Sequence, residues 1–291
     1  MRTIPSSELI INDDGSIFHL HLKPEQLADT VILVGDPGRV ALVAEHFEQI
    51  ECRVQNREFN TVTGSYKGKR MTVLSTGIGI GNIDISVVEL DALANIDFAT
   101  RQEKPVKRRL NLVRLGTSGA IQPDIKVGEV VFSRTSLGFD GLLTYYAGRD
   151  EVCDLDLEKA FVEHTGWNPK LPAPYFIDAD KELFELFKDS TREGITIAAP
   201  GFYAPQGRWV RIQPQDPELN AKIERFEYAG RRITNFEMEG SALAGLAALM
   251  GHRAATICTI IAQRIALDAC TDYKPFVKKM IQTALDKLAT L

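Results

Sequence analysis

The sequence NLVRLGTSG, at residues 111–119, predicts the fold because an apolar strand runs into a glycine-rich turn. The same pattern comes twice earlier in the chain. Val31 to Val34 leads into GDPGR at residues 35–39, and Met71 to Leu74 leads into STGIGIGN at residues 75–82. Segments with the apolar spacing of helices follow these turns. Strands that alternate with helices favour an α/β fold with a largely parallel or mixed sheet.

The rest of the chain continues this alternation. Helices are expected at residues 40–47, 83–94, 183–188, 239–250 and 275–288, and further strands at residues 127–132, 195–198, 232–236 and 255–261. We therefore expect a single α/β domain over residues 1–291, with a central mixed β-sheet flanked by helices in a three-layer sandwich. Residues 1–25 are expected to form a loosely ordered N-terminal lead-in.

Composition excludes several classes of function. The chain has 34 basic and 39 acidic side chains in 291 residues, a formal net charge of -5. This charge indicates neither nucleic acid nor an anionic membrane as partner. The chain has neither an apolar run of about 20 residues nor the basic, apolar start of a secretory signal, so we expect a cytoplasmic protein. Its four cysteines lack metal-ligand spacing and are expected to be free thiols: Cys52, Cys153, Cys258 and Cys270.

Candidate anion-binding residues gather at the predicted strand ends, where α/β sheets bind their ligands. The Gly35 backbone allows close approach to an anion, and Arg39 adds bidentate donors. Arg114 lies in an otherwise apolar strand, where an unpaired charge is costly. Thr117 offers a hydroxyl and an N–H group. The alternative is a set of ordinary turns in which Arg114 forms a structural salt bridge.

A different chemistry is indicated by FYAPQGR at residues 202–208. Phe202 can stack on a flat base. Gln206 offers a donor and an acceptor, whereas Arg208 offers donors only. This set matches a pyrimidine edge, in which acceptor oxygens flank an N–H group. The alternative is a loop of mixed polarity.

Two carboxylates flank a methionine in NFEME, at residues 235–239. Glu239 is placed to accept hydrogen bonds from two vicinal ribose hydroxyls, and Met238 to cover the apolar face of the sugar. The alternative role for Glu239 is to stabilise the N-terminus of the helix that follows. The two roles are compatible.

These motifs in this order resemble nucleoside phosphorylase family I, and within it the uridine phosphorylases. The resemblance runs from about Phe18 to Arg264. It rests on GDPGR, REF at residues 57–59, STGIGIGN, RLGTSGAIQP and NFEME, and FYAPQGR points to uridine rather than a purine. It implies reversible phosphorolysis of uridine to uracil and ribose 1-phosphate, in pyrimidine salvage, by a pentosyltransferase.

The resemblance also implies roles for individual residues. Phosphate would be held by Gly35, Arg39, Arg57, Arg114 and Thr117; ribose by His19, Met238 and Glu239; and the base by Phe202, Gln206, Arg208 and Glu237. Arg114, Gln206 and Arg208 would carry catalysis by stabilising charge. Arg57 and His19 would come from the neighbouring subunit of a homodimer or a hexamer built from dimers.

Some positions depart from the family pattern. Pro205 replaces a glycine, and Asn82 replaces the serine that would join Glu58 and Ile78 in a monovalent-cation site. We therefore expect no metal, and no cofactor besides the co-substrate phosphate. Residues 265–273 also look unusual for the family. The alternatives are a purine nucleoside phosphorylase, which would use an aspartate such as Asp268, a nucleosidase, or a non-catalytic nucleoside-binding protein.

Overall fold

The strands that the glycine pattern predicts form the middle of one sheet. The structure is a computed structural model that describes residues 2–264 and 268–291. Four strands run parallel through its centre: β1 (Thr30–Val34), β4 (Lys69–Ser75), β7 (Asn111–Ala120) and β13 (Arg253–Gln263). All five residues of β1 are buried. Such continuous apolar strands are typical of a sheet that is covered on both faces.

The sheet continues on both sides of this centre. Its order is β11-β12-β10-β8-β13-β7-β1-β4-β3-β2, and β12 also pairs with β7, so that β7, β13, β8, β10 and β12 close into a ring. β8 and β10 run antiparallel to β13, which makes the sheet mixed. The added strands are β2 (Gln49–Asn56), β3 (Phe59–Tyr66), β8 (Val130–Gly138), β9 (Tyr175–Asp178), β10 (Arg192–Ala198), β11 (Glu227–Tyr228), β12 (Arg231–Glu237) and β14 (Asp268–Ala269). A separate small pair consists of β5 (Ile96–Asp97) and β6 (Gln102–Glu103).

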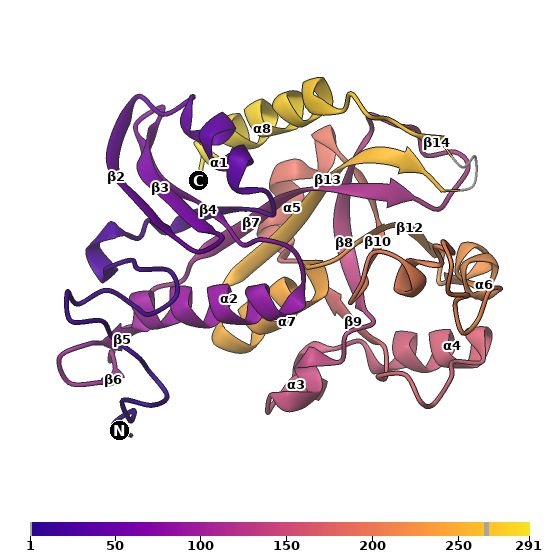
Figure 1. The fold of residues 1–291 in the computed structure, drawn as a ribbon, viewed down its shortest axis with the longest axis horizontal. Helices are drawn as coiled ribbons and strands as arrows, with labels where there is room; N and C mark the ends of the chain where they lie inside the picture. Colours follow the sequence, from indigo (N-terminus) through magenta and orange to yellow (C-terminus); the bar gives the residue numbers. More distant parts are fainter. Residues whose placement is uncertain (1, 265–267) are drawn as a thin grey trace.

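Helices cover both faces of the sheet. Alternate residues of β1 face opposite layers: Val31 and Leu33 pack with one set of helices, Ile32 and Val34 with the other. The first set is α2 (Ile80–Asn95) and α7 (Gly240–Met250), and the second is α1 (Pro37–Ala44), α5 (Lys181–Phe187) and α8 (Lys274–Leu288). Figure 1 shows α2 and α7 side by side below the strands and α8 above them. The expected single α/β domain with a mixed sheet between helices is confirmed.

Three further helices lie where the chain leaves the central sheet: α3 (Arg149–Val152), α4 (Leu155–Thr165) and α6 (Leu219–Arg225). Figure 1 shows two of them, α4 and α6, at one end of the molecule. Phe161 of α4 and Ile223 of α6 are fully buried in one cluster with Phe236 of β12. This cluster packs α4 and α6 against β12, the strand that carries NFEME.

Two predicted strands end well before the observed ones. β7 does not end at Gly116 but continues through the GTSG sequence to Ala120. It continues because Gly116 and Gly119 are both aligned with β13, and Gly119 is also aligned with Phe236 of β12. Likewise β8 runs from 130 to 138 instead of 127 to 132, because β10 pairs with it up to Gly138.

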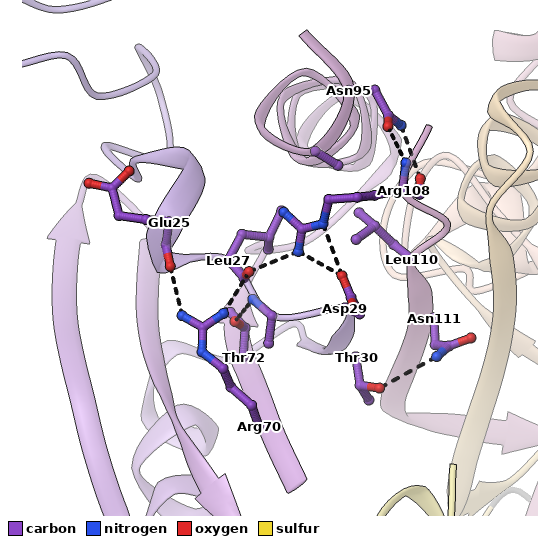
Figure 2. A network of polar contacts seen from close by, with 12 residues as sticks. Glu25, Leu27, Asp29, Thr30, Arg70, Thr72, Asn95, Arg108, Leu110 and Asn111 are labelled. Carbon is purple, nitrogen blue, oxygen red and sulfur yellow. Dashed lines mark hydrogen bonds and ion pairs between the residues drawn. The ribbon is translucent and has the colours of Figure 1, made fainter. Parts of the chain in front are cut away.

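The N-terminal segment is packed more firmly than expected. Leu20 and Leu22 are fully buried. Figure 2 shows how the chain just before β1 is tied to its neighbours. The Leu27 carbonyl accepts from Arg70 Nη1 at 2.9 Å and from Arg108 Nη2 at 3.0 Å, and Arg108 also donates to Asp29 Oδ1 at 2.7 Å. Leu20, Leu22 and the chain just before β1 are therefore packed into the domain.

Candidate active site

Most of the predicted site residues line one cavity of about 830 Å³ at the end of the central strands. The loops after β1, β4 and β10, the last residues of β7 and the β12–α7 junction all border it. The cavity lining includes Gly35, Arg39, Arg114, Thr117, Phe202, Gln206, Arg208, Glu237, Met238 and Glu239. Among the described residues, Arg57 and His19 are the predicted members that do not line it.

Arg114 is the buried cation at the floor of this cavity, and 5 % of it is exposed. Its Nη2 forms an ion pair with Glu239 Oε2, and its Nη1 lies 3.3 Å from Glu237 Oε2. Burial alone would lower the pKa of Arg114, but the Glu239 and Glu237 carboxylates outweigh it and raise the pKa. Because Gly116 has no side chain, it leaves room for the Arg114 guanidinium group. Arg114 therefore stays charged although it is buried.

The two carboxylates of NFEME have different surroundings. Glu237 accepts the N–H groups of Glu239 at 2.9 Å and Gly240 at 2.8 Å, so Glu237 stabilises the first turn of α7. Sequence reasoning assigned that role to Glu239. Glu239 Oε1 instead accepts the Gly79 N–H at 2.6 Å. Burial is the main reason that the pKa of Glu237 is raised.

A second cation approaches the cavity from α1. Asp36 accepts the Gly38 N–H at 2.8 Å and so caps this helix, which places Arg39 in its first turn. Arg39 Nη1 donates to the Leu115 carbonyl at 3.1 Å. Burial, and then the nearby charge of Arg114, lower the pKa of Arg39. Arg39 and Arg114 thus bring two guanidinium groups to the same cavity, and the pairing of Arg114 with Glu237 and Glu239 leaves Arg39 as the less compensated of the two.

The segment Phe202–Arg208 contributes Phe202, Gln206 and Arg208 to the lining and contains one 3₁₀ turn, Ala204–Gln206. Arg208 Nη1 donates to the Phe202 carbonyl at 2.6 Å and also to Gln206 Oε1. Its guanidinium carbon lies 3.6 Å from the centre of the Phe202 ring. Burial, with a contribution from Arg264, lowers the pKa of Arg208 to about 10. The predicted base-reading side chains thus contact one another.

Arg57 and His19 both lie near the Phe18 ring, outside the cavity lining. Arg57 has a φ of 53° in the turn between β2 and β3, and its guanidinium carbon lies 5.7 Å from the Phe18 ring centre. The His19 ring is 4.8 Å from the same ring. His19 Nδ1 lies 2.6 Å from Glu89 Oε1 of α2, which orients the imidazole. The structure brings these two residues to each other but not to the cavity of their own chain.

Other cavity residues were missed by the sequence reasoning. Phe236, Ile261 and Cys270 all contribute to the lining. Their signal was available only indirectly: Phe236 lies within NFEME, where attention fell on the carboxylates and the methionine, and Ile261 is the last residue of the strand predicted at residues 255–261. The backbone of Asp268 pairs with Gln263 in β14. Of the unusual stretch 265–273, residues 265–267 lie outside the described residues, as does the side chain of Asp268.

The residues of the family's monovalent-cation site, including Asn82 in place of serine, can be located in the structure. Asn82 and Glu58 both approach Gly77, since a Cβ on that glycine would lie 2.6 Å from Asn82 Nδ2 and 3.1 Å from Glu58 Cγ. Within residues 2–264 and 268–291, we find no cluster of three or more His, Cys, Asp or Glu side chains arranged for a metal ion. No helix in the same part of the chain is long and apolar enough to span a membrane.

Comparisons with known proteins all point to one family of phosphorylases. The family described as "Phosphorylase superfamily" matches residues 29–291. A uridine phosphorylase of Thermococcus kodakarensis is 30 % identical, over 89 % of this chain and 82 % of its own. A DeoD-type purine nucleoside phosphorylase of Bacillus subtilis is 28 % identical, over 83 % and 85 %.

One solved structure is similar over almost the whole chain. A nucleoside phosphorylase of Trypanosoma brucei, described as showing uridine phosphorylase activity, superposes with a TM-score of 0.89. It is 27 % identical, and the match covers 97 % of this chain and 100 % of that one.

Proposed function

The chain belongs to the phosphorylase superfamily, and from this premise we propose that it is a uridine phosphorylase. As a nucleoside phosphorylase it is a pentosyltransferase. The proposed reaction is the reversible conversion of uridine and phosphate into uracil and ribose 1-phosphate, as in cytoplasmic pyrimidine salvage.

The paired side chains of Gln206 and Arg208 carry the proposal for uridine. Gln206 Oε1 accepts from Arg208, which directs the amide so that its Nε2 remains a donor. A carbonyl oxygen has two lone pairs, so Oε1 can also accept the N3–H of uracil. Nε2 and the remaining Arg208 donors would then bind the two uracil oxygens. The Phe202 ring is half exposed and available to stack on the base.

Phosphate would bind at the opposite side of the cavity. Arg39 and Arg114 supply two buried guanidinium groups, and Gly35 and Thr117 supply small or polar contacts along the same lining. We propose that Arg57 and His19 serve the cavity of a neighbouring copy of the chain, in a homodimer or a hexamer. Their shared location beside Phe18, outside the lining of their own cavity, supports this proposal.

The ribose would lie between these two ends, with Glu239 accepting from its hydroxyls and Met238 against its apolar face. As the bond to the base breaks, positive charge builds on the sugar and negative charge on the departing uracil. A phosphate dianion held by Arg114 stabilises the first charge, and Arg208 with Gln206 stabilises the second. We assign to Glu237 the support of Arg114 and α7, which its contacts favour over base recognition.

Release of free base from a panel of nucleosides tests this function. Uridine, thymidine and inosine are each incubated with the protein, with and without inorganic phosphate. We expect release of uracil that depends on phosphate, and much slower release of hypoxanthine. A preference for inosine would show a purine nucleoside phosphorylase instead, release without phosphate would show a nucleosidase, and no release would show a binding protein.

A further inference from the structure

Asn220 of helix α6 contacts the base-reading loop, residues 202–208, through a hydrogen bond to a backbone carbonyl. The Gln206 carbonyl oxygen accepts from Asn220 Nδ2 at 3.1 Å and from Arg264 Nη2 at 2.8 Å. A carbonyl oxygen has two lone pairs, so these two donors satisfy it completely. Gln206 is 3 % exposed, so water cannot readily replace either donor.

The backbone of the loop is shaped to fit Asn220. Gly207 has a φ of +70°, and a Cβ at this position would meet the Asn220 amide, 2.7 Å from its Cγ. Glycine therefore serves two purposes here: it adopts the left-handed conformation, and it leaves room for the amide. The turn that Asn220 supports is closed by three backbone hydrogen bonds, with Gln206 and Arg208 donating to the Tyr203 carbonyl and Gly207 donating to the Ala204 carbonyl.

Helix α6 is a firm support for this contact. Ile223 is fully buried against Phe161 and Phe226. Lys222 Nζ forms an ion pair with Asp216 Oδ2 at 2.7 Å, and the Lys222 carbonyl lies 2.9 Å from His164 Nε2 of α4. The helix is thus held by packing and by polar contacts that are separate from the loop, so Asn220 transmits a fixed position to Gln206.

We propose that Asn220 is a positioning residue for base recognition. By holding the Gln206 carbonyl, it sets the direction of the Gln206 side chain and of Arg208, which contacts Gln206 Oε1. This inference rests on the proposed function for its consequence, namely that nucleoside binding depends on α6. Asn220 lies outside the cavity lining as described, so it acts through the loop and not on the substrate.

Asn220→Asp is the sharpest substitution because it keeps the shape, removes the donor and places an acceptor against the carbonyl. Arg225→Gln, at an exposed position of the same helix, is the matched control. For uridine phosphorolysis, we expect Asn220→Asp to raise the KM for uridine about tenfold and to lower kcat, with the KM for phosphate unchanged. A fall in kcat with both KM values unchanged would indicate mere loss of folded enzyme and would overturn the proposal, as would unaltered kinetics.

A second measurement does not depend on catalysis. Hydrogen exchange of the amide protons at residues 206–208 reports on the three backbone bonds of the turn. We expect faster exchange in Asn220→Asp than in the wild-type protein and Arg225→Gln. Unchanged exchange would overturn the proposal. If the wild-type protein releases no pyrimidine base, the proposed function fails, and this exchange measurement alone decides the role of Asn220.

Discussion

The guanidinium carbon of Arg208 lies 3.6 Å from the centre of the Phe202 ring, so the cation rests on the face of the aromatic side chain. This stacking and the bond to Gln206 Oε1 hold Arg208 in place before any base enters. Donors that are oriented in advance need little reorganisation during the reaction, which makes them effective at stabilising developing charge. Recognition of the base is thus built into the loop itself.

Arg208→Ala should therefore impair the loss of the base. We expect kcat/KM for uridine to fall about 10²–10³-fold, the usual cost of one preorganised donor, with little change in the KM for phosphate. Steady-state kinetics with each substrate varied in turn measure both effects. Arg211→Ala, at an exposed position three residues further on, is the control. Near-normal kinetics in Arg208→Ala would contradict the assignment.

Arg114→Ala should fail by a different route. Its loss leaves Glu237 and Glu239 buried without their cation, so we expect the free energy of unfolding to fall by about 3–5 kcal/mol. Whatever protein remains folded should need far more phosphate for turnover. Denaturant unfolding and phosphate titration measure these effects. Arg109→Ala, which removes a surface pair with Asp180, should cost less than about 1 kcal/mol and leave the phosphate requirement unchanged.

Glu239→Gln tests the contact with the ribose hydroxyls. Hydrogen bonds to a charged acceptor contribute about 1.5–3 kcal/mol, so kcat/KM for uridine should fall roughly 10–100-fold. 2′-Deoxyuridine lacks one of the two hydroxyls, so the substitution should lower kcat/KM for this substrate less than for uridine. The ratio of the two substrates is measured on the same enzyme preparation, which cancels differences in folded fraction. An unchanged ratio would show that Glu239 does not bind the 2′-hydroxyl.

The raised pKa of Glu237 predicts a pH dependence of stability. An unfolded glutamate titrates near 4.5, whereas burial favours the protonated form of Glu237 in the folded protein. The stability contributed by this group is therefore complete below pH 4.5 and is lost as the pH rises towards neutrality. Glu237→Gln has no carboxyl group to titrate at this position and does not show this loss. As the pH rises, its free energy of unfolding should therefore increase relative to that of the wild type by at most about 1.4 kcal/mol per pH unit. The free energy of unfolding of both proteins is measured between pH 4.5 and 8. A difference between them that stays constant over this range would refute the prediction.

The sequence predicted which residues would gather around one cavity better than it predicted the strand limits, for a physical reason. Glycine and polar residues at the ends of apolar strands are local signals, and parallel strand ends meet at one edge of a sheet. Gly35 and Arg114 could therefore be placed in one site. The extension of β7 past Gly116 depends on β12 and β13, which pair with it from more than 100 residues away, and no local pattern reports such pairing.

The same distinction applies to the side chains. That Arg114 needed a partner followed from its apolar strand, but the identity of that partner required the β12–α7 junction to be placed. Asn220 gave no signal at all, because its role depends on the left-handed Gly207 lying against it. The hairpin of β2 and β3 was also missed, since β2 alternates exposed and half-buried residues and has no apolar run.

The central claim, that the chain transfers ribose from uracil to phosphate, is tested most directly by phosphorus-31 NMR of the protein with uridine and inorganic phosphate. We expect a ribose 1-phosphate resonance to grow as the phosphate resonance declines, with one uracil released for each phosphate consumed. Uracil released without any ribose 1-phosphate, or ribose 1-phosphate formed from inosine but not from uridine, would contradict it.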